Sequence, residues 1–371
     1  MLNIIKKSIF LKLFFKKLKF EYWCLLAWIV FLIIFYYSSN FITGGDFVNG
    51  YKLGSDSPRY INAAFKIING SLPDGKALSY LTYDFFLAFC IFIKINLFGS
   101  VIIQIFLTAI AALCLLKIGT DFWSENVGRL TFFIFLFYPH IQIRNFYILT
   151  ESIFISLTII GFYLITNKSK KFEICGFITL FFASFIRPNS IILLVIIFIK
   201  LLNVIINSNN KFYYYFFLII SLFLIIPVFN IVDILIGKEQ IYNYMLSGAI
   251  IQGFPELNIN PLVLENEIKS KYNIFKIISA FYQDPIYFFN MITTKLYWSI
   301  LRYRPYYSEV HNYFILISSL TAYLFFIIGI FVKIKRNLIL KKLIIYFIAL
   351  TLLVIVFTFV DWSGRFFLPA L

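Results

Sequence analysis

Asp56 lies in a polar stretch that runs from Gly54 to Gly70, between the first apolar segment and the rest of the chain. Tyr60 follows Asp56 by four residues, a spacing that places both side chains on one face of a short helix. A carboxylate is therefore expected at the N-terminal end of this helix, where polar chemistry is available to it. Alternatively, Asp56 only caps the helix and Pro58 occupies its first turn.

A second group of polar residues lies in the apolar segment Leu130–Glu151: His140, Arg144, Tyr147 and Glu151. Their offsets of four, seven and eleven residues from His140 predict a stripe on one helical face, roughly 16 Å long. Because an unpaired charge deep in a bilayer costs several kcal/mol, the stripe is expected to face protein or a water-filled cleft. We expect a cleft that opens outward with Glu151 at its rim. Alternatively, Arg144 pairs with a carboxylate and only ties helices together.

Several arginines are expected on the same, outer side of the membrane. One interfacial arginine is ordinarily an anchor that snorkels to the surface. A group of them on the side where positive charge is not favoured indicates a binding role. Guanidinium groups bind phosphate oxygens bidentately, so the group suits a lipid phosphate or a pyrophosphate. These residues are Arg187, Arg302, Arg304 and Arg365.

The composition predicts an integral membrane protein. Of the 371 residues, 61% are hydrophobic and only 13% are charged, which is more apolar surface than a soluble core of this size can bury. The net charge of +16 comes from Lys and Arg that cluster beside apolar segments, as cytoplasmic flanks do, so nucleic-acid binding is not expected. The four cysteines lie in apolar runs without metal-ligand spacing, so neither disulfides nor a zinc site is expected.

The apolar segments and their charged flanks predict an all-α polytopic protein. The basic lead-in 1–20 places the N-terminus in the cytoplasm and the loop 43–79 outside. The basic cluster at 168–171 is expected in the cytoplasm. When the spans are counted back from it, only one span fits between that loop and residue 119. The segment 80–98 is therefore expected to lie along the outer interface, where Asp84 and Lys94 can snorkel.

This scheme gives a single domain, 1–371, with about nine spanning helices. The first outer loop, 43–98, carries surface helices at 57–69 and 80–98, and a second long outer loop covers 233–311. The odd number of spans raises the expectation that the chain lacks a further C-terminal helix. The expected spans lie near 22–41, 101–116, 130–150, 152–166, 174–187, 190–206, 213–232, 313–332 and 343–360.

Short motifs are distributed over nearly the whole chain. They are Gly54-Ser-Asp56…Tyr60…Ala63-Ala64…Gly70, Tyr138-Pro139, Leu149-Thr150-Glu151-Ser152, Arg187-Pro188 and Arg365-Phe-Phe-Leu-Pro369. This pattern resembles the GT-C superfamily of membrane glycosyltransferases, in particular the bacterial relatives of the protein O-mannosyltransferases and the aminoarabinose lipid A transferases. In that family the first outer loop carries an Asp near its start and two surface helices. A second acidic residue follows an outward-going span, where this chain has Glu151.

The resemblance implies an inverting hexosyl or pentosyl transferase in the cytoplasmic (inner) membrane, with its active site on the extracytoplasmic side. The donor would be a sugar on a polyprenyl phosphate, and the acceptor a hydroxyl group of a cell-envelope lipid, glycan or protein. Asp56 would be the general base and Glu151 the second catalytic carboxylate. No cofactor is required, although Mg²⁺ or Mn²⁺ could bridge the two carboxylates and the phosphate. The implied substrate-binding residues are Tyr60, Lys76, His140, Arg144, Arg187, Arg302, Arg304 and Arg365.

Two other functions fit the same sequence. An O-antigen-type polymerase or ligase also has many spans and a long outer loop with arginines, and it would place its chemistry in the later loop. A transporter or flippase would use the His140–Arg144–Glu151 stripe as its path. Inverted repeats and helices broken at the midplane, which favour a transporter, are not clear in the sequence.

Overall fold

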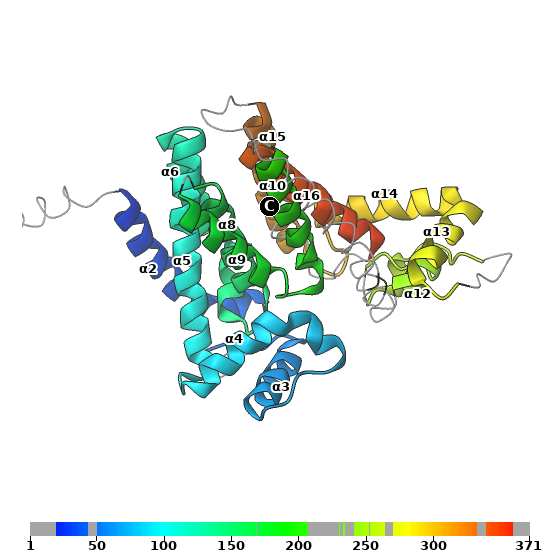
Figure 1. Ribbon diagram of the computed structural model, residues 1–371, viewed down its shortest axis with the longest axis horizontal. Helices are drawn as coiled ribbons and strands as arrows, with labels where there is room; N and C mark the ends of the chain where they lie inside the picture. Colours follow the sequence, from blue (N-terminus) through cyan, green and yellow to red (C-terminus); the bar gives the residue numbers. More distant parts are fainter. Residues whose placement is uncertain are drawn as a thin grey trace, which may run out of the picture.

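The structure is a computed structural model, and it describes residues 20–43, 50–167, 169–206, 241–251, 253–263, 270–331 and 339–358, with 230 and 233. Most of these residues are helical, and the described part of the chain contains no strand, although an isolated bridge joins Lys52 and Tyr147. Figure 1 shows two parts, a larger bundle built on α5 and a smaller group formed by α12, α13 and α14. The fold is therefore all-α, as the sequence predicts.

The larger bundle contains α2 (Phe20–Thr43), α3 (Ser57–Ile68), α4 (Leu81–Phe92), α5 (Asn96–Phe122), α6 (Glu125–Phe137), α7 (Pro139–Gln142), α8 (Glu151–Ile165), α9 (Lys170–Ala183) and α10 (Ile192–Ile206). The rest of the described chain contains α12 (Ile241–Leu246), α13 (Asn273–Gln283), α14 (Pro285–Leu301), α15 (Glu309–Phe331) and α16 (Ile339–Phe357). Four short 3₁₀ helices lie between them: η1 (Gly75–Tyr80), η2 (Ile143–Phe146), η3 (Pro188–Ile191) and η4 (Pro255–Leu257).

Four helices in the described ranges are long and apolar enough to cross a membrane. They lie at Phe20–Ser38, Asn96–Phe122, Glu309–Gly329 and Leu340–Phe357. Shorter apolar stretches occur at Ala77–Phe92, Glu151–Ile165 and Pro188–Asn203. These helices indicate a membrane-associated protein. The lead-in before residue 20 and the span expected near 213–232 lie outside the described residues.

The prediction of one continuous helix over 130–150 is wrong. The helix α6 ends at Phe137, and Tyr138 adopts an extended conformation (φ −79°, ψ 105°). The residue before a proline is sterically disfavoured in the helical region, and Pro139 follows. The chain then continues through α7 and η2 and reaches α8 only at Glu151. The polar residues of this segment therefore do not form a stripe on one helix.

The prediction of a surface helix over 80–98 is also corrected. The helix α4 ends at Phe92 and α5 begins at Asn96, because Lys94 and Asn96 adopt left-handed backbone conformations (φ 63° and 60°). Lys94 is exposed, but Asp84 is buried completely instead of snorkelling to the surface. The cause is that α4 packs against both α3 and α5.

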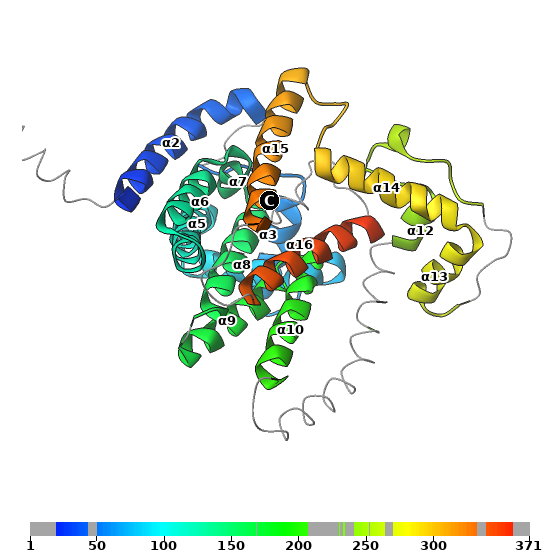
Figure 2. The ribbon, with the colours of Figure 1, turned by 90° about the horizontal axis from the view of Figure 1, so that it is seen from above.

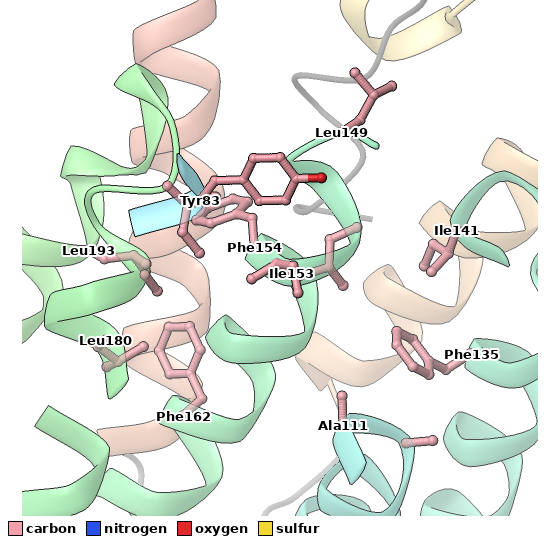
Figure 3. Close-up of a cluster of buried hydrophobic side chains, with 14 of the residues drawn as sticks. Tyr83, Ala111, Phe135, Ile141, Leu149, Ile153, Phe154, Phe162, Leu180 and Leu193 are labelled. Carbon is pink, nitrogen blue, oxygen red and sulfur yellow. The ribbon is translucent and has the colours of Figure 1, made fainter. Parts of the chain in front are cut away.

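The main hydrophobic core lies where α5, α6, α8 and α9 meet. Figure 3 shows part of it, with Phe162 and Leu180 on one side and Ala111 and Phe135 on the other. A second, smaller core joins α12, α13 and α14. The helix α16 contributes to both, through Leu340, Leu343 and Phe347 in the first and Ile355 in the second, and Figure 2 shows it running from α10 toward α14. It ties the two parts together.

Close approach of α5 and α6 depends on two glycines. A Cβ added at Gly119 would lie 2.5 Å from the Cα of Gly128, and one added at Gly128 would lie 2.5 Å from the carbonyl oxygen of Leu116. Gly128→Ala is therefore expected to force the helices apart and to destabilise the fold by about 1–3 kcal/mol, measured as a lower thermal unfolding midpoint in detergent. In contrast, Gly329→Ala in α15 meets no atom within 4 Å and should not lower the midpoint. Equal midpoints for the two variants would contradict this packing.

Candidate functional site

A short parallel pairing of two loop segments brings Asp56 and Glu151 together. The amide of Lys52 donates to the carbonyl of Phe146 (2.8 Å), and the amide of Ile148 donates to the carbonyl of Lys52 (3.1 Å). Lys52 thereby pairs with Tyr147 in parallel. Asp56 follows Lys52 by four positions and is the N-cap residue of α3. Glu151 likewise follows Tyr147 by four positions and is the first residue of α8. The equal offsets place both carboxylates at neighbouring helix N-termini, where the helix dipole stabilises negative charge.

The side chain of Ser57 strengthens this junction. Its hydroxyl group accepts a hydrogen bond from the amide of Gly54 and donates one to the carbonyl of Ile148, both at 2.8 Å. The segment before α3 is thus bound to the segment before α8 by backbone and side-chain bonds. Ser57 is buried completely, so these bonds are shielded from water.

Asp56 occupies the N-cap position of α3, but its side chain makes no capping hydrogen bond. Its Oδ1 instead lies 3.2 Å from Nη2 of Arg59, and 24% of the side chain is exposed. Pro58 lies in the first turn, as the sequence predicts. The alternative that Asp56 serves only to cap the helix is therefore not supported by this geometry. Its carboxylate is accessible and held by a neighbouring guanidinium.

Glu151 is the first residue of α8 and is 1% exposed. Its Oε1 lies 3.6 Å from Nη2 of Arg187, which is also buried and whose guanidinium lies 5.9 Å from the ring centre of Phe154. Arg187 begins η3 in an extended conformation, and its amide donates to the hydroxyl group of Ser190. The sequence places Arg187 at the interface as one of several arginines; the structure buries it against the second carboxylate.

Three tyrosines pack against one another beside α3. Tyr60 in α3 is 2% exposed, and its ring contacts those of Tyr80 and Tyr83 at 5.0 and 5.2 Å. Burial raises the pKa of Tyr60 well above its usual value, and the nearby Tyr80, Glu151 and Asp56 raise it further. Figure 3 shows Tyr83 beside Phe154, which continues this aromatic wall into the core.

A buried hydrogen-bond network holds the segment that precedes Glu151. The side-chain amide nitrogen of Gln104 donates to the carbonyls of Asn145 (2.9 Å) and Tyr147 (3.1 Å). The Oε1 of Gln104 accepts from the hydroxyl group of Tyr83. The Asn145 Oδ1 accepts from Thr108 (2.8 Å) and from Ser152 (2.5 Å). Sequence reasoning missed these residues because their periodicity is that of ordinary core positions. They fix an irregular segment against α4, α5 and α8.

Three other predicted site residues belong, together with His311, to a separate, basic cluster. Its members are His140 from α7, Arg144 from η2, Arg302 at the C-terminal end of α14, and His311 from α15. Burial, together with the positive charges of Arg302, Arg144 and His311, lowers the pKa of His140 to about 3. The groups that act on His140 and those that act on Tyr60 have no member in common. The predicted residues are therefore divided between two clusters.

Several side-chain nitrogens in the basic cluster have no hydrogen-bond partner among the described residues. They are Nε and Nη1 of Arg302, Nε of Arg144 and Nε2 of His140. Arg302 is only 4% exposed and adopts a left-handed backbone (φ 54°), a strained conformation for a residue of this size. Buried donors of this kind are normally satisfied, so the cluster is chemically suited to an anion.

An apolar cavity of about 270 Å³ lies next to this cluster. It is lined by residues of α5, α6, α8, α15 and α16, and by Tyr138, two residues before His140. The ring centres of Tyr138 and His140 are 5.7 Å apart. The ring centre of Phe314 in α15 lies 5.4 Å from that of His140. Its apolar lining suits the cavity to a hydrocarbon chain.

The low pKa of His140 gives a testable pH dependence of stability. An imidazole in the unfolded chain has a pKa near 6.5, whereas that of His140 in the fold is about 3. Below pH 6.5 the unfolded state therefore binds a proton that the folded state does not, so the contribution of His140 is lost as the pH falls from 6.5 toward 3. We expect His140→Gln to lose less stability over this range than the wild type, measured by thermal unfolding. Parallel curves would contradict the burial of a neutral imidazole.

Three predicted residues do not join either cluster. Nη1 of Arg304 donates to the carbonyls of Trp298 and Tyr303, both at 2.8 Å, and so caps the end of α14. Lys76 lies in η1, and its side chain is outside the described part of the structure. Arg365 lies outside the described residues altogether. The structure also adds three residues that the sequence analysis did not assign to a site, namely Arg59, Asp84 and His311.

No group of three or more His, Cys, Asp or Glu side chains in the described ranges could hold a metal ion. Comparison of the chain with protein-family models, with curated proteins and with solved structures finds no match in any of the three.

Proposed function

We propose that the protein is an inverting membrane glycosyltransferase of the GT-C type, which transfers a sugar from a polyprenyl phosphate to an acceptor hydroxyl group. The observation that carries this proposal is the parallel pairing of Lys52 with Tyr147. It holds Asp56 and Glu151 at adjacent helix N-termini, one accessible and one buried. Such an arrangement supplies a carboxylate base beside a fixed cation, Arg187.

In the proposed reaction, Asp56 takes the proton of the acceptor hydroxyl group. The acceptor oxygen attacks the anomeric carbon from the side opposite the phosphate, so a new C–O bond forms while the bond to the phosphate oxygen breaks and the configuration inverts. The lipid phosphate leaves with the bonding electrons. Cationic groups stabilise the charge that develops on it. Glu151 fixes the guanidinium of Arg187 through their buried ion pair.

The basic cluster supports a donor that is a lipid phosphate. Its buried guanidinium and imidazole nitrogens without acceptors suit phosphate oxygens, and the adjacent apolar cavity suits the first part of a prenyl chain. A volume of about 270 Å³ corresponds to a short piece of such a chain, so the remainder would extend into the bilayer. We assign His140, Arg144 and Arg302 to this role.

The proposed arrangement in the membrane follows the charge pattern of the sequence. The N-terminus lies in the cytoplasm, and both clusters lie at the outer surface of the cytoplasmic membrane. About nine spans are proposed. The helices α8, α9 and α10 are 15, 14 and 15 residues long, so each needs its flanking residues or a locally thinned bilayer to span.

The experiment uses membranes that contain the protein, a labelled polyprenyl-phosphate sugar and an extract of envelope acceptors. Label is expected to move from the donor to the acceptor fraction, with or without added Mg²⁺ or Mn²⁺. Loss of transfer in a chelator would make the metal part of the site. Movement of intact labelled donor across the membrane, without cleavage, would favour a flippase and remove the enzymatic proposal.

A further inference from the structure

The helix α14 carries its only charged residue on its buried side. Lys295 is 0% exposed and shares a face with the buried Phe288 and Met291. The opposite face is uncharged and mostly apolar. Its exposed large side chains are Ile286, Phe289, Tyr297 and Ile300. A helix on a water-facing surface shows the reverse pattern, with its charges outside and its apolar side chains inside.

The preceding helix, α13, repeats this pattern. Its only charged residue, Lys276, is half-buried, and the ammonium group lies 5.8 Å from the ring centre of Tyr242 in α12. The exposed side chains of α13 include Phe275, Ile278 and Tyr282, whose spacing of three and four residues places them on one face. Both helices thus turn a lysine toward the protein and apolar side chains away from it. Neighbouring exposed apolar side chains of this kind mark a contact surface.

The hydrogen bonds of Lys295 fix where α14 lies. Its Nζ donates to the carbonyl oxygens of Thr358 (2.6 Å) and Val356 (3.4 Å), at the C-terminal end of α16. The last carbonyls of a helix have no partner within it, and the negative end of the helix dipole favours a cation there. Lys295 is near the middle of α14, so the middle of this helix lies at the end of α16. Figure 2 shows α16 ending beside α14.

This contact sets the depth of α14 in the membrane. The helix α16 is long and apolar enough to cross a bilayer, and the end of a spanning helix lies near the bilayer surface. The exposed apolar side chains of α14 extend from residue 286 to residue 300, about 21 Å at 1.5 Å per residue. If α14 stood upright with its middle at the surface, half of this face would extend into water. A position along the surface, with the apolar face toward the lipid chains, is typical of interfacial helices.

The neighbouring surface of α16 favours lipid as the occupant of these faces. Leu353 and Phe357 are exposed on α16, and their spacing of four residues places them on one face that leads to its C-terminal end. Lipid chains cover the exposed side chains of a spanning helix. The same lipid therefore reaches the residue that precedes Thr358, to which Lys295 is bound.

We propose that α13 and α14 form a membrane-surface unit, in which Lys295 holds α14 against the end of α16 and the apolar faces of both helices rest among lipid chains. The sequence analysis expects a long outer loop over 233–311. In this proposal the helices of that loop lie in the surface of the bilayer. The inference concerns attachment to the membrane and does not depend on the proposed reaction.

Photolabelling of the wild-type protein in phospholipid vesicles tests the lipid contact without any substrate. The vesicles contain a phospholipid with a diazirine on its acyl chain, which forms a carbene on illumination and inserts into the groups that the chain touches. Phe289 and Tyr297 should be labelled to a similar extent as Ile317, an exposed residue of the candidate span in α15. Met291 is the matched control, because it is buried on the other face of α14 and should receive several-fold less label.

Hydroxyl radicals generated in the water phase give the complementary measurement. Phe289 and Tyr297 should be oxidised several-fold less in the vesicles than after the protein is unfolded. Oxidation as strong as in the unfolded protein, without carbene labelling, would place this face in water. Protection from both reagents would place it against a second copy of the chain or another protein. Either result overturns the proposal.

Lys295→Leu tests the anchor separately. The substitution removes the donor to the end of α16 but keeps the position apolar, so carbene labelling of Phe289 should fall several-fold while that of Ile317 stays unchanged. Lys276→Leu leaves both bonds to α16 in place and should keep the label on α14. Equal labelling of Phe289 in Lys295→Leu and the wild type would overturn the role of Lys295. The wild-type experiment decides the lipid contact whether or not this variant folds.

Discussion

Asp56→Asn is expected to lower the rate of sugar transfer by about 10²–10⁴-fold, the usual contribution of a positioned general base. Asparagine keeps the shape of the side chain but cannot accept the proton of the acceptor hydroxyl group. The Asp56 side chain makes no capping hydrogen bond, so the substitution removes no bond to the backbone of α3. The loss should therefore appear in the rate of transfer, measured with labelled donor in membranes, and not in the amount of folded protein.

The matched control is Asp74→Asn. Both residues are carboxylates of the first outer loop that pair with a basic residue of α3, Lys66 in the case of Asp74. Because Asp74 is exposed and lies apart from Glu151, its replacement should leave transfer within about twofold of the wild type, as is usual for surface substitutions. Unchanged transfer in Asp56→Asn, with a normal level of protein, would sink the proposed mechanism. An equal loss in both variants would point instead to a general defect of the loop.

Local signals in the sequence were sufficient for the helix that follows Asp56. The prediction of a helix over 57–69 is confirmed by α3, with Pro58 in its first turn and Gly70 just after its end at φ 77°. Tyr60, Ala63 and Ala64, which their spacing places on one face, are buried in α3. These features depend on neighbours within one or two turns, which the sequence displays directly.

The pairing that joins the two carboxylates was not predictable by the same reasoning. Lys52 and Tyr147 are far apart in the sequence, and their bonds are between backbone groups, which every residue possesses. The burial of Asp84 depends likewise on packing between α3 and α5. By contrast, the break at Tyr138 had a local signal, Pro139, whose effect on the preceding residue outweighs the apolar periodicity of 130–151.

That break also changes which functions the site favours. A continuous helix would have carried His140, Arg144 and Glu151 along one path, as a transporter requires. In the structure His140 and Arg144 belong to the basic cluster, whereas Glu151 pairs with Arg187. The separation gives one cluster the charges suited to an anion and the other the carboxylates suited to proton transfer. A group-transfer enzyme needs both.

Arg187→Met is expected to destabilise the protein by about 3–5 kcal/mol, the typical cost of removing one partner from a buried ion pair. Glu151 is 1% exposed and its Oε1 lies 3.6 Å from Nη2 of Arg187, so the substitution removes this cation from a buried carboxylate. Methionine has a similar length and remains apolar, which limits the cavity. The loss should be measured as a decrease in the free energy of unfolding in detergent.

The double variant Glu151→Gln with Arg187→Met separates charge from packing. Replacement of both partners removes the uncompensated charge, so the double variant should recover much of the stability that Arg187→Met loses. The exposed pair Glu125–Arg129 in α6 supplies the control, since Arg129→Met should cost less than about 1 kcal/mol. If Arg187→Met costs no more than Arg129→Met, then Glu151 is not held by this pair, and the role of Arg187 as the fixed cation of the proposed reaction fails with it. If the double variant is stable but inactive, the pair serves the reaction as well as the fold.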